Sequence, residues 1–259
     1  MIREGIGTVG RHTLDLVGGL GSITTYGCRL TRVVFTRPWR LRSLLRQVFD
    51  AGVLSLLLIG ASGVTVGMVL ALQGYHTLTR FGAEASLGAV VGLALIRELG
   101  PVLTALLVTG RAGSAKAAEI GAMVTTEQLD GLRMMAIDPV DFVVVPRALA
   151  LIFVMPLLTA LFTVSGVFGG YLVGIEFLGL DSGTYLASLE SSVDFRGDVL
   201  ASFLKSVIFG MLVALIATYR GFTCRPTTEG VSAATTSTVV TASVCILLSD
   251  YVITALLGV

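Results

Sequence analysis

The residues of this sequence that could do chemistry are four charges that interrupt apolar stretches: Arg97, Glu98, Lys205 and Asp250. A charge at the centre of a bilayer costs about 2.5–3.5 kcal/mol on insertion scales, so we expect none of the four to face lipid. They could line a polar path for a substrate, or they could form a buried network of structural ion pairs. Lys205 and Asp250 have opposite charges and could pair with each other or with Arg97 and Glu98.

Arg97 and Glu98 are adjacent in the chain, which determines the directions in which their side chains point on a helix. Neighbouring side chains point about 100° apart, so the two residues meet different partners. Pro101 has no N–H and would leave the carbonyl of Arg97 without its helical hydrogen bond. The sequence therefore predicts a kink at this point.

Motifs of catalysis are missing from the sequence. The nearest approach to a phosphate-binding P-loop is GRAGSAK, Gly110–Lys116, but it lacks the Gly before the Lys and the Ser or Thr after it. There is no HExxH motif, no zinc pair and no GxSxG elbow, and the three cysteines have no metal-ligand spacing. We expect neither an enzyme activity nor a cofactor or metal in this chain, so the energy for any work must come from elsewhere.

The composition indicates what kind of scaffold positions these charges. Hydrophobic residues make up 54% of the 259 residues and charged residues only 14%, and the mean hydropathy is +0.89. A soluble monomer would expose too much apolar surface, so we interpret the chain as an all-α integral membrane protein. The net charge of +1 gives no reason to expect a nucleic-acid partner.

Five stretches are apolar and long enough to cross a bilayer, which takes about 20 helical residues. They are approximately Ala51–Tyr75, Ala85–Thr109, Phe142–Ile175, Leu200–Tyr219 and Val239–Leu257. Glycines at a spacing of four predict close helix contacts in the first three: Gly63, Gly67, Gly88, Gly92, Gly166, Gly170 and Gly174.

We interpret residues 1–259 as a single domain. The segment before the first span predicts its orientation in the membrane. Within residues 1–47, apolar residues at helical spacing predict an amphipathic interfacial helix, with a frayed terminus as the alternative: Ile2, Ile6, Val9, Leu16, Leu20 and Ile23. Six arginines follow it: Arg29, Arg32, Arg37, Arg40, Arg42 and Arg46. This run indicates a cytoplasmic N-terminus, and the acidic loop over residues 176–198 indicates the opposite side. Residues 48–259 form the bundle, and its five crossings put the C-terminus outside.

The insert between the second and third spans predicts a short amphipathic helix on the cytoplasmic side. Thr125-x-x-Gln128 matches a capping box, and Asp138-Pro139 is a turn signal at the far end. One apolar stripe runs along it, with charged residues on the other faces: Leu129, Leu132 and Met135, against Glu127, Asp130 and Arg133. This pattern is typical of a helix that lies in a partner's groove, and packing on its own bundle is the alternative.

Several motifs together resemble the MlaE permease family. The most specific is the string from Gly100 to Arg147, which contains EIG, TEQLDGL, DP and VPR in order. Asp181-Ser182-Gly183, LKSVIFG at 204–210 and EGVSAATTSTVV at 229–240 continue the resemblance over nearly the whole chain. The resemblance implies a permease of an ABC transporter that moves phospholipids between the inner and outer membranes of a Gram-negative cell.

The resemblance also implies partners. Two copies of the permease would form the core as a homodimer in the inner membrane. Two MlaF-type ATPases would bind ATP and Mg²⁺ beneath it, with a small MlaB-type STAS protein bound to the ATPases. A hexameric MlaD-type ring would cap the outer side.

Residue roles follow from the resemblance by position. The helix from Glu127 to Met135 resembles the family's coupling helix, which contacts the ATPase through Glu127, Gln128, Leu129, Asp130, Leu132 and Met135. Arg97, Glu98, Lys205 and Asp250 correspond to the family's charges within the membrane. Spans one, two and five would line a lipid cavity between the two copies, with Leu70, Leu78 and Phe81 as candidates for its upper wall.

Rival functions from other classes are an ion-gradient-driven transporter or channel that uses the four membrane charges, and a non-transporting scaffold that only anchors other subunits. A more distant one is an intramembrane hydrolase. Transport in the absence of any ATPase would favour the first of these, and the absence of lipid between two copies would favour the second.

Overall fold

The structure is a computed structural model that describes residues 2–36 and 40–257, with side chains from residue 18 onward apart from residues 20 and 257. In this part of the chain the regular elements are all helical. The α-helices are α1 (Ile2–Thr36), α2 (Leu41–Gly52), α3 (Leu56–Leu78), α4 (Leu87–Ala94), α5 (Gly100–Val108), α6 (Ser114–Thr125), α7 (Gln128–Met134), α8 (Val145–Leu172), α9 (Ser182–Ser192), α10 (Leu200–Phe222) and α11 (Thr228–Leu257). Short 3-10 segments and π-helical segments join several of them end to end.

Five continuous helical rods are long and apolar enough to cross a membrane, which confirms the predicted fold class. They cover Leu41–Phe81, Glu84–Thr125, Val140–Phe177, Phe195–Phe222 and Thr228–Leu256. Each rod extends beyond the predicted span, and the second differs most, because it continues through GRAGSAK to Thr125. The predicted span ends at Thr109, before this motif; in the structure the helix continues, and Lys116 is buried in it, where it pairs with Glu119 at 2.9 Å.

The predicted glycine contacts are confirmed where α3 crosses α8. A Cβ added to Gly67 would lie 1.8 Å from the carbonyl oxygen of Gly166, and one added to Gly169 would lie 2.2 Å from that of Val64. No side chain fits at either position, so the two backbones touch directly. This contact fixes the first and third spans against each other at the centre of the bundle.

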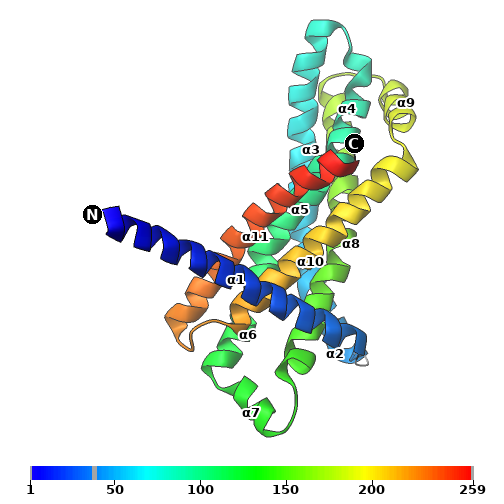
Figure 1. The fold of residues 1–259 in the computed structure, drawn as a ribbon. Helices are drawn as coiled ribbons and strands as arrows, with labels where there is room; N and C mark the ends of the chain where they lie inside the picture. Colours follow the sequence, from blue (N-terminus) through cyan, green and yellow to red (C-terminus); the bar gives the residue numbers. More distant parts are fainter. Residues whose placement is uncertain (1, 37–39, 258–259) are drawn as a thin grey trace.

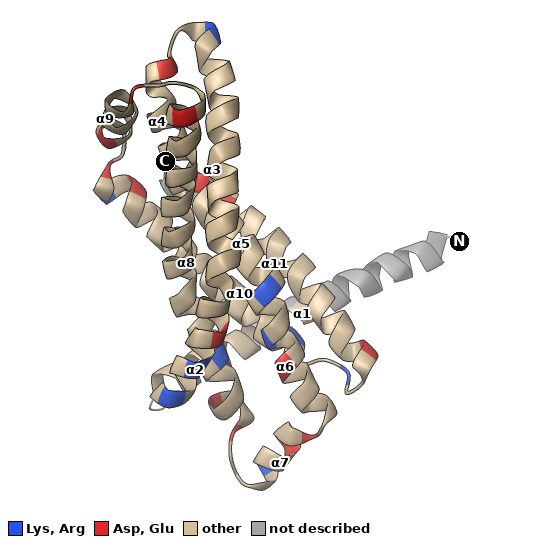
Figure 2. Ribbon diagram, turned by 180° about the vertical axis from the view of Figure 1, so that it is seen from behind, with Lys and Arg blue, Asp and Glu red and all other residues tan. Residues whose placement is uncertain are grey.

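The two ends of the bundle differ in what they present (Figure 1). α2, α7 and the turn between α10 and α11 lie at one end, while α9 and the end of α11 lie at the other. Lysines and arginines gather at the α2 and α6 end, with acidic residues among them, whereas the α9 end is mainly acidic (Figure 2). We call these the α7 end and the α9 end.

The long helix α1 crosses the bundle near the α7 end (Figure 1). Tyr26 packs its ring against Tyr219 and Phe222 of α10, and Arg29 pairs with Asp138 at 3.2 Å. Most side chains of the predicted amphipathic stripe, from Ile2 to Leu20, lie outside the described residues, as does Arg37 of the basic run. The interfacial role of this helix stays a prediction.

The start of α7 differs from the predicted capping box. Thr125 ends α6, and its hydroxyl donates to the carbonyl of Gly121 at 3.0 Å instead of capping the next helix. The residue before α7 is Glu127, which has a left-handed φ of 56°. The capping prediction was wrong because a threonine hydroxyl can bond to the carbonyl one turn back in its own helix.

Candidate functional site

Lys205 of α10 is the centre of a charged cluster inside the bundle, toward its α9 end. Its ammonium group lies 2.9 Å from Glu98 Oε1, 3.2 Å from Asp250 Oδ1 and 2.8 Å from Thr254 Oγ1. Lys205 is only 1% exposed. The structure therefore brings three of the four predicted charges together and ties the second, fourth and fifth rods at one point.

The same ammonium group also bonds to the main chain next to Pro101. Lys205 Nζ donates to the carbonyl oxygen of Arg97 at 2.9 Å. Pro101 cannot donate a helical hydrogen bond to this carbonyl, because proline has no N–H. The π-helical segment Leu95–Leu99 (η4) lies directly before Pro101, at the position of the predicted kink. A buried cation thus replaces the missing helical hydrogen bond.

Arg97 points to a different partner from Glu98, as their adjacency predicted. Its Nε lies 2.8 Å from Asp198 Oδ1, and the Asp198 side chain is almost fully buried. Asp198 belongs to η8 (Phe195–Val199), directly before α10. We had counted this residue with the acidic loop after the third span. The apolar run that starts at Val199 is the signal that could have placed it at the membrane.

The candidates for the cavity wall are only partly brought together. Leu70 and Leu78 line one groove of about 280 Å³ between α3 and α4, with Gln73, Thr77 and Val90. Phe81 is not among the residues that line this groove, and its side chain is 78% exposed at the tip of the first rod. The groove opens on the surface of the single chain, so a closed cavity would need a second wall.

α7 turns part of its predicted docking stripe inward. Leu129 is 4% exposed and packs with Ile120 and Val143, and Leu132 packs beside them. The accessible apolar side chains are Met135 of the predicted stripe, which is 63% exposed, and its neighbour Met134, which is 90% exposed. Exposed polar and charged side chains surround them: Glu127, Gln128, Asp130 and Arg133. Within the single chain Leu129 is already covered, so the contact between this helix and a partner stays a prediction, and Leu129 offers little surface for it.

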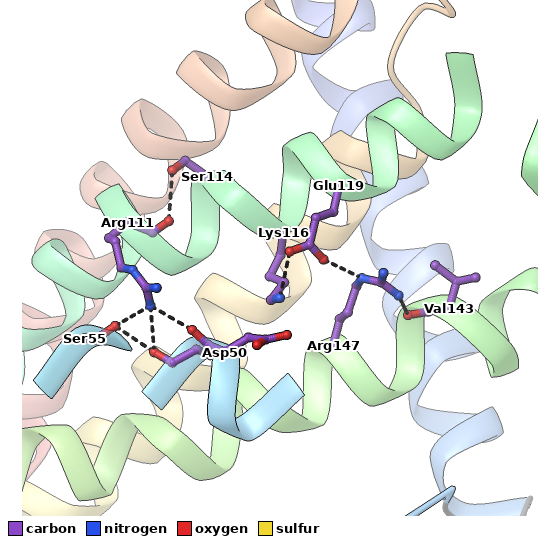
Figure 3. A network of polar contacts seen from close by, with 9 residues as sticks. Asp50, Ser55, Arg111, Ser114, Lys116, Glu119, Val143 and Arg147 are labelled. Atoms are coloured by element: carbon purple, nitrogen blue, oxygen red, sulfur yellow. Dashed lines mark hydrogen bonds and ion pairs between the residues drawn. The ribbon is translucent and has the colours of Figure 1, made fainter. Parts of the chain in front are cut away.

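A second charged network fastens the two helices that flank α7 (Figure 3). Glu119 of α6 binds Lys116 through Oε1 at 2.9 Å and Arg147 of α8 through Oε2 at 3.1 Å. Arg147 also donates to the carbonyl of Val143 at 2.9 Å. Sequence reasoning missed this clamp, although Glu119 and Arg147 both lie within the most specific motif.

Arg111 extends the network to the first rod (Figure 3). Its Nη1 donates to the carbonyls of Asp50 and Ala51 at 2.9 and 3.2 Å and to Ser55 Oγ at 2.8 Å. These acceptors lie where α2 gives way to α3, at a helix junction whose carbonyls need outside donors. The α7 end is therefore joined through side chains from the first rod to the third.

Comparison with known proteins bears directly on these clusters. A family model described as Permease MlaE matches residues 44–256. The chain belongs to the MlaE permease family. The match begins within α2 and covers the rest of the first rod, the other four rods, both charged networks and α7.

Individual relatives extend the MlaE similarity along the chain. The intermembrane phospholipid transport system permease protein MlaE of Haemophilus influenzae is 45% identical, over 99% of this chain and 98% of its own. A probable ABC transporter permease protein of Rickettsia typhi is 40% identical over 96% of both chains. The chloroplastic protein TRIGALACTOSYLDIACYLGLYCEROL 1 of Arabidopsis thaliana is 34% identical over 83% of this chain and 61% of its own length. The chain is thus a multi-pass permease of an ABC transporter.

Proposed function

We propose that this permease moves phospholipids between the inner and outer membranes of a Gram-negative envelope, driven by a separate MlaF-type ATPase that binds ATP and Mg²⁺. The observation that carries the proposal is the 45% identity, over nearly all of both chains, to a permease named for intermembrane phospholipid transport. The groove beside Leu70 and Leu78 and the buried charges near it supply what a diacyl lipid requires, which is apolar space with sparse polar groups.

The charge distribution supports the orientation. Lysines and arginines gather at the α7 end, which we assign to the cytoplasm, and the mainly acidic α9 end then faces the periplasm. With this orientation the N-terminus is cytoplasmic and the C-terminus periplasmic. Met134 and Met135 of α7 then face the compartment that holds ATP, so we assign to them the contact with the ATPase.

Two copies of the chain would enclose the lipid. The first and fifth rods leave large apolar side chains uncovered, among them Leu57, Leu72, Val252 and Leu256. A second copy placed against these rods would close the groove between α3 and α4 and complete a homodimer. An MlaD-type hexameric ring would continue the path at the α9 end, and an MlaB-type STAS protein would bind the ATPase.

The ion pair between Glu119 and Arg147 supports a route by which a movement of the ATPase is transmitted to the lipid groove. A displacement of α7 would pull on α6 and α8 together, because Glu119 and Arg147 join them. Arg111 would pass part of that displacement to the start of α3, which lines the groove. Binding of the ATPase shifts the permease between two conformations by as much as its affinity for the two conformations differs.

Reconstitution tests the proposal. Proteoliposomes that hold the permease, its ATPase and the ring should transfer a fluorescent phospholipid to acceptor vesicles when ATP is added, and should not when the ATPase is omitted. Transfer driven by an ion gradient without the ATPase would favour the rival transporter. Assembly of all subunits without any transfer would favour the scaffold, and either result would overturn the proposal.

A further inference from the structure

The turn between α10 and α11 lies at the α7 end of the bundle (Figure 1). Side chains at this turn line a polar hollow. Its volume is about 450 Å³. The residues that matter for its chemistry are Arg220, Cys224, Arg225, Glu229 and Ser237. The hollow is separate from the clamp, from the Lys205 cluster and from the groove between α3 and α4.

The charge balance of the hollow favours an anion. Arg220 and Arg225 contribute two positive charges against the single carboxylate of Glu229. Among the described residues, no carboxylate forms an ion pair with either arginine, and the one hydrogen bond of Arg220 is a long one of 3.4 Å to Thr241. Burial raises the pKa of the Cys224 thiol, so this side chain stays neutral and does not offset the excess.

Two buried polar atoms at the hollow have no hydrogen-bond partner in the described part of the chain. They are Arg220 Nε and Ser237 Oγ. Buried polar groups are paired in most folded proteins, so an unpaired guanidinium nitrogen and an unpaired hydroxyl on one hollow call for a ligand that accepts hydrogen bonds. The N-terminus of α11 offers fewer free donors to a ligand, because Thr227 already accepts hydrogen bonds from the N–H groups of Gly230 and Val231.

An apolar track leads away from the hollow along α11. A second, more open hollow of about 660 Å³ shares Glu229, Ala233 and Ser237 with the first and reaches Val240. From Val240 the apolar face continues along the helix to Val244 and Leu248 at a spacing of four residues. Each of the three has more than half of its surface exposed. A cationic hollow joined to an apolar helix face has the shape of a site for an amphiphile.

We propose that this hollow binds the phosphate group of a phospholipid, with Arg220, Arg225 and Ser237 as donors and the acyl chains along α11. The assignment rests on the proposed function and adds a lipid subsite at the end opposite the Lys205 cluster. Guanidinium groups bind phosphate through paired hydrogen bonds, and Glu229 disfavours ligands that carry several negative charges. Free phosphate shares the headgroup chemistry, and the apolar track favours the lipid.

Photo-crosslinking tests the site in the intact complex. p-Benzoylphenylalanine is placed at Ala233, which lines both hollows, and in a second sample at Thr77 in the groove between α3 and α4. The complexes are reconstituted in phosphatidylcholine with ³²P-labelled phosphatidylglycerol and irradiated. We expect labelling at Ala233 to fall about tenfold in Arg220→Gln/Arg225→Gln, since paired charge-assisted hydrogen bonds are lost. Arg80→Gln/Arg196→Gln removes the same charge at the α9 end and should leave the labelling unchanged.

The outcomes separate this site from the function it rests on. Equal labelling at Ala233 in the two double variants, or labelling at Thr77 with none at Ala233, would overturn the site and leave phospholipid transport standing. An absence of labelling at both positions would count against the proposed function itself. Millimolar inorganic phosphate that removes the Ala233 label would assign the site to free phosphate, and its failure to compete supports the lipid. Should the double variant misfold, Arg225→Gln alone repeats the test, because Arg225 is exposed.

Discussion

The bundle contains two buried charge networks that use the same residue types in different ways. In the Lys205 cluster, one ammonium group binds two carboxylates inside the apolar part of three rods. In the network at the α7 end, Arg111 and Arg147 donate chiefly to main-chain carbonyls at helix junctions, and Glu119 is the carboxylate that joins two cations. The Lys205 cluster lies within the proposed membrane span, where water is scarce, whereas the network at the α7 end lies toward the proposed cytoplasmic surface, where water can replace a lost partner. Loss of a charge should therefore cost more in the first than in the second.

Replacement of Lys205 by Met gives the largest expected effect. Glu98 and Asp250 would lose their shared cation, and the Arg97 carbonyl would lose its donor. Removal of one partner from a buried ion pair costs about 3–5 kcal/mol, so we expect severe loss of folded protein. Thermal unfolding of the purified permease in detergent, together with its yield from membranes, measures the effect.

A triple variant shows whether the cluster is only structural. Lys205→Met combined with Glu98→Gln and Asp250→Asn removes the unpaired charges and should recover most of the folded protein. Wild-type phospholipid transport by this triple variant would mean that the charges serve packing alone. A folded triple variant that does not transport would assign the cluster to the lipid path.

The same contrast explains what the sequence could predict. The four membrane charges stood out because each interrupts an apolar run, and the freed carbonyl of Arg97 followed from Pro101. Asp198 and Glu119 did not stand out, because they lie outside the predicted spans, where a charge needs no explanation. Arg147 lies just inside the predicted third span, and the sequence did not indicate its partner, because Glu119 is 28 residues away. Burial of Leu129 was beyond reach as well, because the face that a seven-residue helix exposes depends on how its neighbours fold against it. Ile120 and Val143 lie outside α7, in the helical segments before and after it.

Replacement of Arg147 by Met at the α7 end should have a smaller effect on stability. It removes one ion pair to Glu119 and one hydrogen bond to Val143, while Lys116 remains paired. We expect a loss of about 1–2 kcal/mol in the free energy of unfolding. Because the clamp joins α6 and α8 on either side of α7, the amount of phospholipid moved per ATP hydrolysed should fall. The rate of ATP hydrolysis itself should fall less.

A matched control is Arg46→Met, which removes an exposed cation of α2 at the same end of the bundle. It should leave both the stability and the ratio of transport to hydrolysis unchanged. An unchanged ratio in Arg147→Met as well, with the expected loss of stability, would reduce the clamp to a structural contact without a role in coupling.

The smallest effect on stability is expected at α7, outside both networks. Met134 is 90% exposed, so Met134→Asp loses almost no packing and should leave the unfolding temperature unchanged. If Met134 and Met135 contact the ATPase, a buried and unpaired carboxylate at that interface should release the ATPase during co-purification. Ser191→Asp adds the same charge at the α9 end and should retain it. Full retention of the ATPase by Met134→Asp would mean that α7 is held by its own bundle through Leu129 and that the partner binds another surface of the α7 end.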